Sequence, residues 1–391
     1  MLSQEYLNLM KDIHQNILDF LEDESVSGEN FQNLEDIFIN TRISNSRYNF
    51  LSLLHLITKI WNNHHRFPSF FSKIEKILQF FKEDIKKYFS NSQLFNIFKS
   101  NKKILLYLIE QQIIVFDKYI VKTITTTCKY IDANYPEYFQ PEIQPFINEK
   151  WFPKYNRELK KDEWVEHIKK ELPEYFYELR KKGENSSQIC ELIRNDMITD
   201  FVVYLTKHNI SPNAKIQPSI YETNSFLLKD KKNEGFSLIE YAAFFGSIQI
   251  FNHLRFVNAQ LTSRLWYLAI HGKNAEIIHF LEDNHVELED KSYKKMFYES
   301  IKCHHIEIAN YFMNNFFKKS EEDSFDTLIQ CLKYYDFAFF QKELIIESSF
   351  YYFCKYDFCT LVDFLLKNEN IDINNRSISF LFNIISYDNF F

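Results

Sequence analysis

The sequence predicts an all-α protein in which an N-terminal helical module precedes a solenoid of stacked helical hairpins. Three observations predict this class. Five glycines and eight prolines in 391 residues are too few for a turn-rich β-sandwich or barrel. Apolar residues recur at helical spacing over most of the chain. In the C-terminal half, a short residue pattern returns at intervals compatible with one helical hairpin per repeat.

The N-terminal module is predicted over residues 1–130 as a series of consecutive helices. In the first helix, apolar residues from Tyr6 to Leu21 fall on one face. The loop that follows is expected around Ser25 to Asn30, where one of the five glycines stands. Further helices are expected at 48–61, from Pro68 onward, at 94–98 and at 104–109.

A charged connector with five of the eight prolines is predicted over residues 131–182. Proline removes a backbone donor and collides with the preceding turn, so Tyr135–Pro153 cannot form one continuous helix. From Arg157 to Lys182 opposite charges alternate at helical spacing, which indicates a solvated helix that is interrupted near Pro173. We therefore place a module boundary in this connector.

A repeat array is predicted over residues 183–391. Its clearest copy contains Ala242 and Ala243, two small residues that allow helices to approach closely, and Gly246, which is expected to end the first helix in a left-handed cap. The first alanine has counterparts elsewhere, and these anchors are Ile193, Ala242, Ala269, Ser300, Cys331 and Phe353. The long first step predicts an inserted loop around Asn209 to Asn233, and the short last step predicts a truncated hairpin.

The cap position itself is degraded in the other copies. Where Gly246 stands in the clearest one, the others carry Lys273, His304, Tyr335 and Asp357. His and Asp tolerate a left-handed conformation, whereas Lys and Tyr are not obvious substitutes for glycine. Gly272 precedes Lys273 and offers an alternative position for that cap.

The segment Gly235–Phe251 resembles the ankyrin repeat, whose pattern G-x-T-P-L-H-x-A-A-x-x-G-H-x-E-I-V it follows in part. More widely, the chain resembles a large family of divergent ankyrin-like proteins, expanded in parasitic flagellate protists, that carries a domain of unknown function. This resemblance implies an ankyrin-type solenoid with a protein-binding role and supplies no catalytic residues. An unrelated stack of HEAT or TPR type is the alternative. The wider resemblance rests on residues 63–66, 70–75, 101–106, 183–186, 222–228, 239–247, 269–272 and 300–305.

Composition excludes several functional classes. The five glycines cannot form a GxGxxG or GxxxxGK[ST] motif, so a dinucleotide fold built on that fingerprint and a P-loop NTPase are excluded. HExxH, GxSxG and EF-hand patterns do not occur either. A net charge of −7 argues against a nucleic-acid binder. We therefore predict no enzymatic activity.

Location and redox state follow from the same composition. The longest stretch without Asp, Glu, Lys or Arg runs from Tyr241 to Leu254, shorter than the about 20 residues of a membrane-spanning helix. The first residues carry an early acid and no basic segment, so a signal peptide is not expected. The six cysteines form no CxxC pair, which indicates reduced thiols in the cytoplasm, with entry into the nucleus left open.

Three groups of His, Cys and Glu residues are candidates for metal or acid–base sites. Zinc uses Cys and His, but these residues do not occur here at ligand spacing, and adjacent side chains on a helix diverge. We therefore expect structural turns or solvated surface, and neither metal nor cofactor. The groups are His64 with His65, His271 with Cys303, His304 and His305, and Glu163 with His167 and Glu171.

In an ankyrin repeat, the positions two and three residues after the first alanine face the concave surface. Lys occupies the first of these positions in three successive copies, and Tyr follows it in two, which suits an acidic, partly apolar peptide. The alternative is that exposed positions simply carry Lys. The candidate partner-binding residues are Phe244, Phe245, His271, Lys302, Lys333, Tyr334, Lys355 and Tyr356.

The predicted function is a non-catalytic protein–protein interaction scaffold that binds its partner by the concave face. Two other functions stay open. One is an enzyme with an unrecognised site in the N-terminal module, which buried histidines and carboxylates with perturbed pKa values in a deep pocket would reveal. The other is nucleic-acid binding through the lysines, which strong dependence on salt would reveal.

Overall fold

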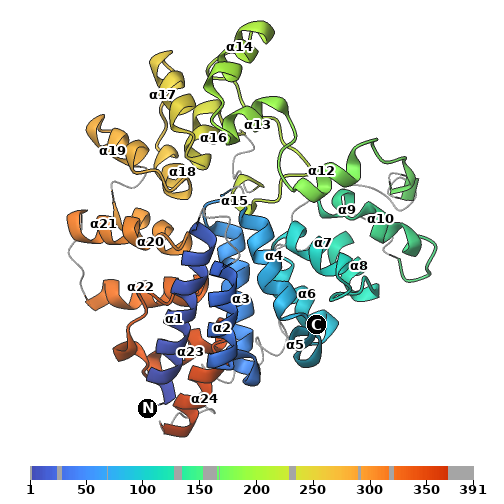
Figure 1. The fold of residues 1–391 in the computed structure, drawn as a ribbon, viewed down its shortest axis with the longest axis vertical. Helices are drawn as coiled ribbons and strands as arrows, with labels where there is room; N and C mark the ends of the chain where they lie inside the picture. Colours follow the sequence, from blue (N-terminus) through green and yellow to red (C-terminus); the bar gives the residue numbers. More distant parts are fainter. Residues whose placement is uncertain are drawn as a thin grey trace. The chain divides into compact units, whose positions relative to one another are not determined.

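A computed structural model describes residues 2–23, 29–67, 69–126, 134–152, 165–166, 168–228, 235–288, 292–316 and 321–368. Over these ranges the protein is all-α, as predicted, and the β structure is limited to one isolated bridge between Lys215 and Ser237 (Figure 1). Among the same residues, every helix is too short or too polar to cross a membrane.

The chain divides into two compact units. Unit 1 comprises Met1–Tyr88 and Leu288–Phe391, and unit 2 comprises Phe89–Glu287. The chain passes from one unit to the other after Tyr88 and after Glu287. These positions differ from the module boundaries expected near 130 and 182, and the expected boundaries stay a prediction.

The N-terminal half of unit 1 consists of amphipathic helices, as the spacing of apolar residues predicts. Met10, Ile13 and Ile17 are buried on α1. Ser46 caps α3, where its side chain accepts a hydrogen bond from the Asn49 amide at 3.4 Å. The helices are α1 (Leu2–Glu22), α2 (Glu29–Thr41), α3 (Arg47–Asn63), α4 (Phe70–Phe80) and α5 (Lys82–Tyr88). The loop expected at Ser25 to Asn30 lies largely outside the described residues.

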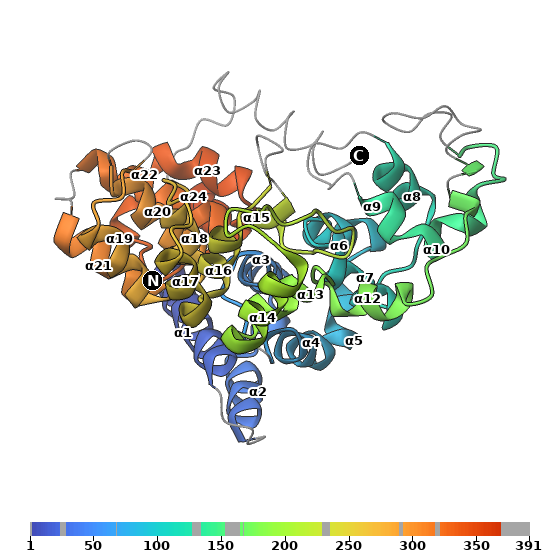
Figure 2. The same cartoon turned by 90° about the horizontal axis from the view of Figure 1, so that it is seen from above.

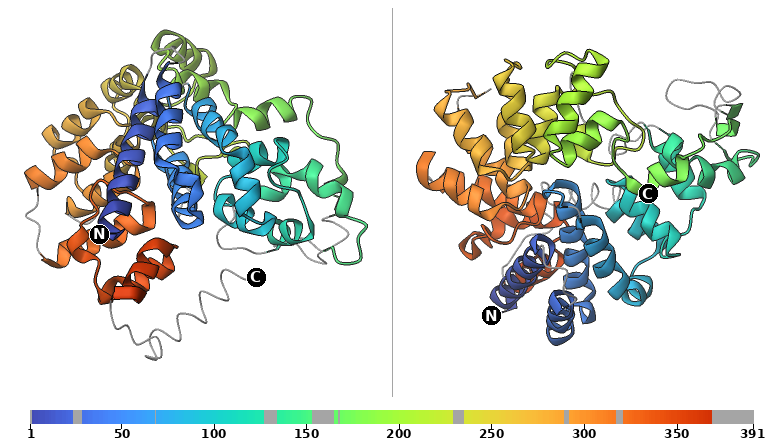
Figure 3. Two further views of the ribbon diagram at one scale, coloured as in Figure 1. Left: turned by 60° about the horizontal axis from the view of Figure 1, so that its bottom comes forward. Right: turned by 45° about the horizontal axis from the view of Figure 1, so that its top comes forward.

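The C-terminal half of unit 1 consists of helical hairpins packed against the N-terminal helices. Helix α24 contacts both α1 and α3, and Figure 3 shows these C-terminal helices beside α1. The elements are α20 (Lys294–Lys302), α21 (Ile306–Phe316), α22 (Glu321–Tyr334), η3 (Lys342–Leu344), η4 (Glu347–Ser349), α23 (Phe350–Lys355) and α24 (Cys359–Asn368). Between α22 and α23, where the sequence predicts a truncated hairpin, the structure has the short helices η3 and η4.

Unit 2 continues the all-helical pattern. Its helices α16 and α18 pack directly against each other and lie side by side in Figure 2. The described elements are α6 (Asn91–Phe98), α7 (Lys102–Glu110), α8 (Lys118–Thr125), α9 (Tyr135–Tyr138), α10 (Gln140–Ile143), η2 (Gln144–Phe146), α12 (Phe176–Lys182), α13 (Gln188–Arg194), α14 (Ile198–His208), α15 (Ser225–Leu228), α16 (Leu238–Phe245), α17 (Ile248–Phe256), α18 (Leu265–His271) and α19 (Ala275–Asp283).

The connector is broken where its prolines stand. Short turns α9, α10 and η2 replace a continuous helix, as predicted. The expectation of a solvated helix needs correction at α12. There Arg180 is buried and donates to Tyr138 O at 3.1 Å and to Glu142 Oε2 at 2.8 Å, while Phe176 is buried as well. Residues 153–164 lie outside the described part.

Left-handed residues stand at most of the positions that the sequence aligns with Gly246. Gly246 forms the expected left-handed cap, and four aligned residues adopt the same conformation although they are not glycine. These residues and their φ angles are Gly246 (67°), Lys273 (49°), His304 (58°), Tyr335 (57°) and Asp357 (59°). In the first copy the left-handed residue is Asp196, one position earlier than the anchor Ile193 predicts.

Gly272 is not an alternative left-handed cap, because its φ is −72°. Its role is to allow a close approach of two helices. A Cβ atom at Gly272 would lie 2.1 Å from the Ala243 carbonyl oxygen and 2.9 Å from the Gly246 nitrogen. Small residues are therefore required where α16 and α18 meet.

Candidate functional site

The candidate lysines lie at the ends of neighbouring helices in unit 1. Lys302 ends α20, Lys333 lies in the last turn of α22, and Lys355 ends α23. Helix α22 packs against α20 on one side and α23 on the other. The three positions therefore follow one another along adjacent helices, which Figure 1 shows in orange to red.

Lys333 and Lys355 are exposed, and each lies over a tyrosine ring. The Lys333 Nζ is 4.9 Å from the centre of the Tyr334 ring, and the Lys355 Nζ is 5.4 Å from that of Tyr356. Both tyrosines are half-buried. Lysine over an aromatic face is a favourable cation–π arrangement. We call Lys333, Tyr334, Lys355 and Tyr356 the Lys–Tyr ladder.

A neighbouring residue ties the two parts of the ladder together. The Tyr335 hydroxyl donates a hydrogen bond to the Tyr356 carbonyl oxygen. Tyr335 is buried and follows Tyr334 directly. A core side chain thus links the backbone beneath the two parts of the ladder.

Lys302 differs from the other two lysines. Its side chain is half-buried, and Nζ donates to Glu299 Oε1 at 2.5 Å. Burial by itself lowers the pKa of this ammonium group, but the carboxylate of Glu299 raises it to about 12. The charge of Lys302 is therefore compensated within α20, and Lys302 adds little net positive potential to the ladder.

Three of the predicted partner-binding residues lie in unit 2, namely Phe244, Phe245 and His271. The prediction requires correction there, because Phe244 and His271 are buried. Only 5% of Phe244 and 2% of His271 is exposed. Phe226, from the predicted inserted segment, covers both: its ring centre is 5.8 Å from Phe244 and 4.3 Å from the His271 ring. Phe245 is half-buried against Tyr241. Phe244 and His271 are therefore core residues of unit 2.

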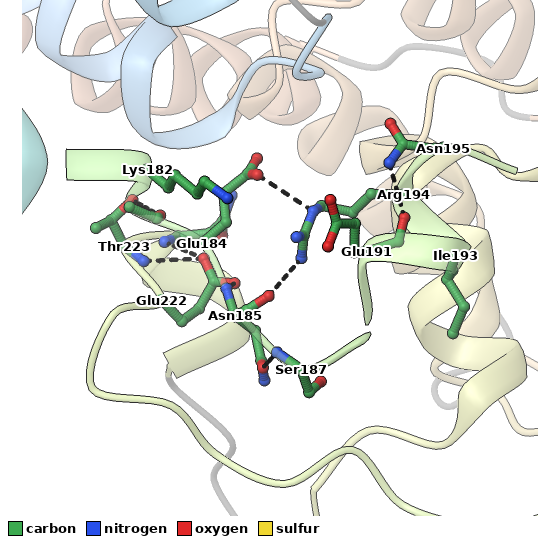
Figure 4. A network of polar contacts seen from close by, with 12 residues as sticks. Lys182, Glu184, Asn185, Ser187, Glu191, Ile193, Arg194, Asn195, Glu222 and Thr223 are labelled. Atoms are coloured by element: carbon green, nitrogen blue, oxygen red, sulfur yellow. Dashed lines mark hydrogen bonds and ion pairs between the residues drawn. The ribbon is translucent and has the colours of Figure 1, made fainter. Parts of the chain in front are cut away.

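A polar network in unit 2 has no counterpart in the sequence prediction (Figure 4). Arg194 donates to the Asn185 carbonyl oxygen at 2.9 Å and forms an ion pair with Glu184 at 3.2 Å. The buried carboxylate of Glu222 accepts hydrogen bonds from the amides of Asn185, Thr223 and Asn224. These contacts hold the loop at residues 184–187 and the segment at 222–224 in place.

A second unpredicted feature is a buried cluster in unit 1, which we call the His–His–Asp cluster. It comprises His14 of α1, His304 of the turn after α20, and Asp336 of the turn after α22. His304 Nδ1 lies 3.0 Å from His14 Nε2 and 3.8 Å from Asp336 Oδ2. All three residues are 1% exposed.

Burial controls the charge of this cluster. It lowers the pKa of His14 to about 3 and that of His304 well below its usual value, so both rings are neutral. Burial raises the pKa of Asp336 to about 7, although the amides of Phe339 and Ala338 oppose this rise. The cluster therefore holds two neutral imidazoles beside a carboxyl group that burial makes easier to protonate.

The histidine pairs noted in the sequence make structural contacts in unit 1. His64 Nδ1 lies 2.9 Å from the Cys303 carbonyl oxygen, and its Nε2 is 3.2 Å from Glu22 Oε1. The His65 amide donates to His305 Nε2 at 3.4 Å. The contacts of His64 with Cys303 and of His65 with His305 join the end of α3 to the turn between α20 and α21, which is a structural role.

The acid–base candidate of the connector is only partly described. Glu163 and His167 lie outside the described residues, and Glu171 is exposed.

Burial affects the reactive groups of unit 1 in two ways. In the His–His–Asp cluster, the side chains of His304 and Asp336 have no exposed area, so a substrate does not reach them in this conformation. Burial raises the pKa of the Cys354 thiol to about 12 and that of Cys359 to about 11, so their thiolate populations are small at neutral pH.

Sequence reasoning missed the His–His–Asp cluster for a simple reason. His304 was recognised only as a turn residue, and nothing in the local spacing relates it to His14, which lies 290 residues away. Asp336 directly follows Tyr335, the left-handed residue that the sequence aligns with His304. This position in the alignment is the one sequence feature that relates Asp336 to His304.

Comparison of the chain with protein-family models, with curated proteins and with solved structures gave no match.

Proposed function

We propose that this protein is a non-catalytic scaffold with ankyrin-like repeats that binds an acidic, partly apolar segment of another protein on the Lys–Tyr ladder. The observation that carries the proposal is the pairing of an exposed lysine with a half-buried tyrosine at equivalent places of α22 and α23. Left-handed turns at matching positions and small residues at the α16–α18 contact support the ankyrin-like arrangement.

The ladder suits such a segment on chemical grounds. Carboxylates of the partner would pair with Lys333 and Lys355, and an apolar side chain would rest on the ring of Tyr334 or Tyr356. The lysines are exposed, so their attraction is screened by salt and contributes more to the association rate than to affinity. We expect moderate affinity that falls as salt is added.

We also propose a cytoplasmic location, with access to the nucleus left open. The cysteines of the described residues are free thiols, which suits a reducing compartment.

The test is fluorescence anisotropy with a labelled peptide of alternating Glu and Tyr, compared with a Lys–Tyr peptide of equal length. The wild type is compared with the variant Lys333→Glu, Lys355→Glu. We expect the variant to bind the acidic peptide at least about tenfold more weakly, because two attractive charges become repulsive.

The matched control is Lys86→Glu, Lys87→Glu on α5. Both residues are exposed, and the Lys87 Nζ lies 4.9 Å from the Tyr88 ring centre, like the lysines of the ladder. This control makes the same change of charge elsewhere in unit 1. Equal losses in both variants would contradict a specific site. Tighter binding to a single-stranded oligonucleotide than to the peptide would favour nucleic-acid binding instead.

A further inference from the structure

We propose that His14, His304 and Asp336 bind one divalent transition-metal ion, with zinc the best match to these ligands, in the core of unit 1. The proposal does not depend on the Lys–Tyr ladder. Two imidazoles and one carboxylate form a common type of zinc ligand set. Here the side chains come from three separate helices and turns and are all buried.

The distances fit a single ion. Ligand bonds of about 2.0–2.2 Å at tetrahedral angles place neighbouring ligand atoms roughly 3.4 Å apart. In the cluster, the separation from His304 Nδ1 is 3.0 Å to His14 Nε2 and 3.8 Å to Asp336 Oδ2. The ligand atoms of the three residues all lie within 4.8 Å of one another. Small side-chain movements would therefore bring all three atoms to ligand distance from one ion.

The carboxylate of Asp336 is held in place by the backbone. Its Oδ1 accepts hydrogen bonds from the amides of Ala338 at 2.9 Å and Phe339 at 3.4 Å. Its Oδ2 is buried without a hydrogen-bond partner and is turned toward His304. A buried carboxylate oxygen without a partner is costly, and a cation bound beside it would remove that cost. The fixed Oδ1 thus orients Oδ2 as a ligand.

The histidines require one proton shift. The Phe337 amide donates to His14 Nδ1 at 3.4 Å, which places the proton of the neutral ring on Nε2, where it points at His304 Nδ1. Binding through Nε2 moves that proton to Nδ1 and ends the contact with Phe337. This contact is at the long limit of a hydrogen bond, so its loss is small beside three metal–ligand bonds.

The fold explains why these residues meet. His304 occupies a left-handed turn, and Asp336 directly follows the left-handed residue of the next hairpin, Tyr335. The two turns present their side chains to His14 on α1. An ion here would join the first helix to two C-terminal hairpins and would close a very long loop of the chain, which stabilises the folded state. Its expected role is therefore structural.

The test uses the full-length protein produced in medium supplemented with Co²⁺, so that the ion enters while the buried site folds. Co²⁺ replaces Zn²⁺ in such sites and reports its ligands by visible absorption. We expect one Co²⁺ per chain by elemental analysis, an absorption spectrum of nitrogen and oxygen ligation, and displacement by Zn²⁺. The midpoint of thermal unfolding should be higher for the loaded protein than for protein produced with a chelator.

Two variants remove ligands with little change of shape. Asp336→Asn keeps an oxygen atom that can accept the hydrogen bonds from the amides of Ala338 and Phe339. His304→Asn introduces a residue that tolerates the left-handed conformation. We expect each to bind Co²⁺ at least about 100-fold more weakly. The control is His285→Asn, the same exchange at an exposed left-handed histidine with φ 49°, which should bind like the wild type.

Wild-type protein without stoichiometric metal would overturn the proposal. So would equal binding by wild type, Asp336→Asn and His304→Asn, because the ion would then lie elsewhere. If His304→Asn does not fold by circular dichroism, Asp336→Asn and His14→Gln decide the outcome.

Discussion

Tyr335 and Asp357 show why a left-handed turn here does not need glycine. Such a conformation costs about 1–2 kcal/mol for a residue with a side chain. The Tyr335 ring stacks on His55 and Phe358 at 5.0 and 4.6 Å, and Asp357 lies 3.5 Å from His55 Nε2. Each side chain thus makes a contact with α3 that glycine could not make, and this offsets the strain.

At the residue scale, we predict that Gly272→Ala lowers the free energy of unfolding by about 3 kcal/mol. The added methyl group would lie 2.1 Å from the Ala243 carbonyl oxygen, so α16 and α18 must move apart. Urea denaturation measures the change. The control is the neighbouring Lys273→Gly, which relieves a left-handed lysine with φ 49° and should change stability by less than about 1 kcal/mol. Equal stability of Gly272→Ala and wild type would contradict the close contact.

At the scale of elements, helix beginnings are fixed by side-chain caps of unequal importance. Asn101 is the N-cap of α7: it accepts hydrogen bonds from the amides of Lys103 and Ile104 and donates to the Thr223 carbonyl oxygen at 3.1 Å. It is 1% exposed. Ser90 is the N-cap of α6, where it forms a capping box, and it is exposed. The first cap also anchors a distant loop, whereas the second serves its own helix.

We therefore predict that Asn101→Ala destabilises the protein by about 3 kcal/mol and Ser90→Ala by about 1 kcal/mol. The larger value arises because alanine at 101 leaves buried amides and the Thr223 carbonyl without their partner. Chemical denaturation of both variants, followed by circular dichroism, gives the comparison. Similar losses would show that the contact with Thr223 contributes little to stability.

At the scale of the whole molecule, unit 1 is assembled from both ends of the chain. Tyr6 of α1 packs on Phe337 with ring centres 6.4 Å apart, and the Thr360 hydroxyl of α24 donates to Asn49 of α3 at 2.8 Å. Each terminal segment buries its apolar faces against the other. The two segments thus form one unit together, whereas unit 2 is continuous in sequence.

The fragment 89–287 should therefore unfold cooperatively on its own, and the fragment 1–88 should not. Adding 288–391 to 1–88 should restore helicity and a cooperative transition, because the shared core forms again. Circular dichroism and calorimetry of the separate and mixed fragments test this. Cooperative unfolding of 1–88 alone would contradict the shared core.

The sequence by itself determined the all-α class and the left-handed cap at Gly246, because these depend on residues that are near neighbours along the chain. The spacing of apolar residues marks the helices, and the glycine that follows Phe245 marks the cap. Tertiary structure alone decided that Phe226 covers Phe244 and His271, that the segments before residue 89 and after residue 287 form one unit, and that His14 meets His304 and Asp336. These contacts join residues far apart in sequence, and their partners leave no periodic signal from which they could be predicted.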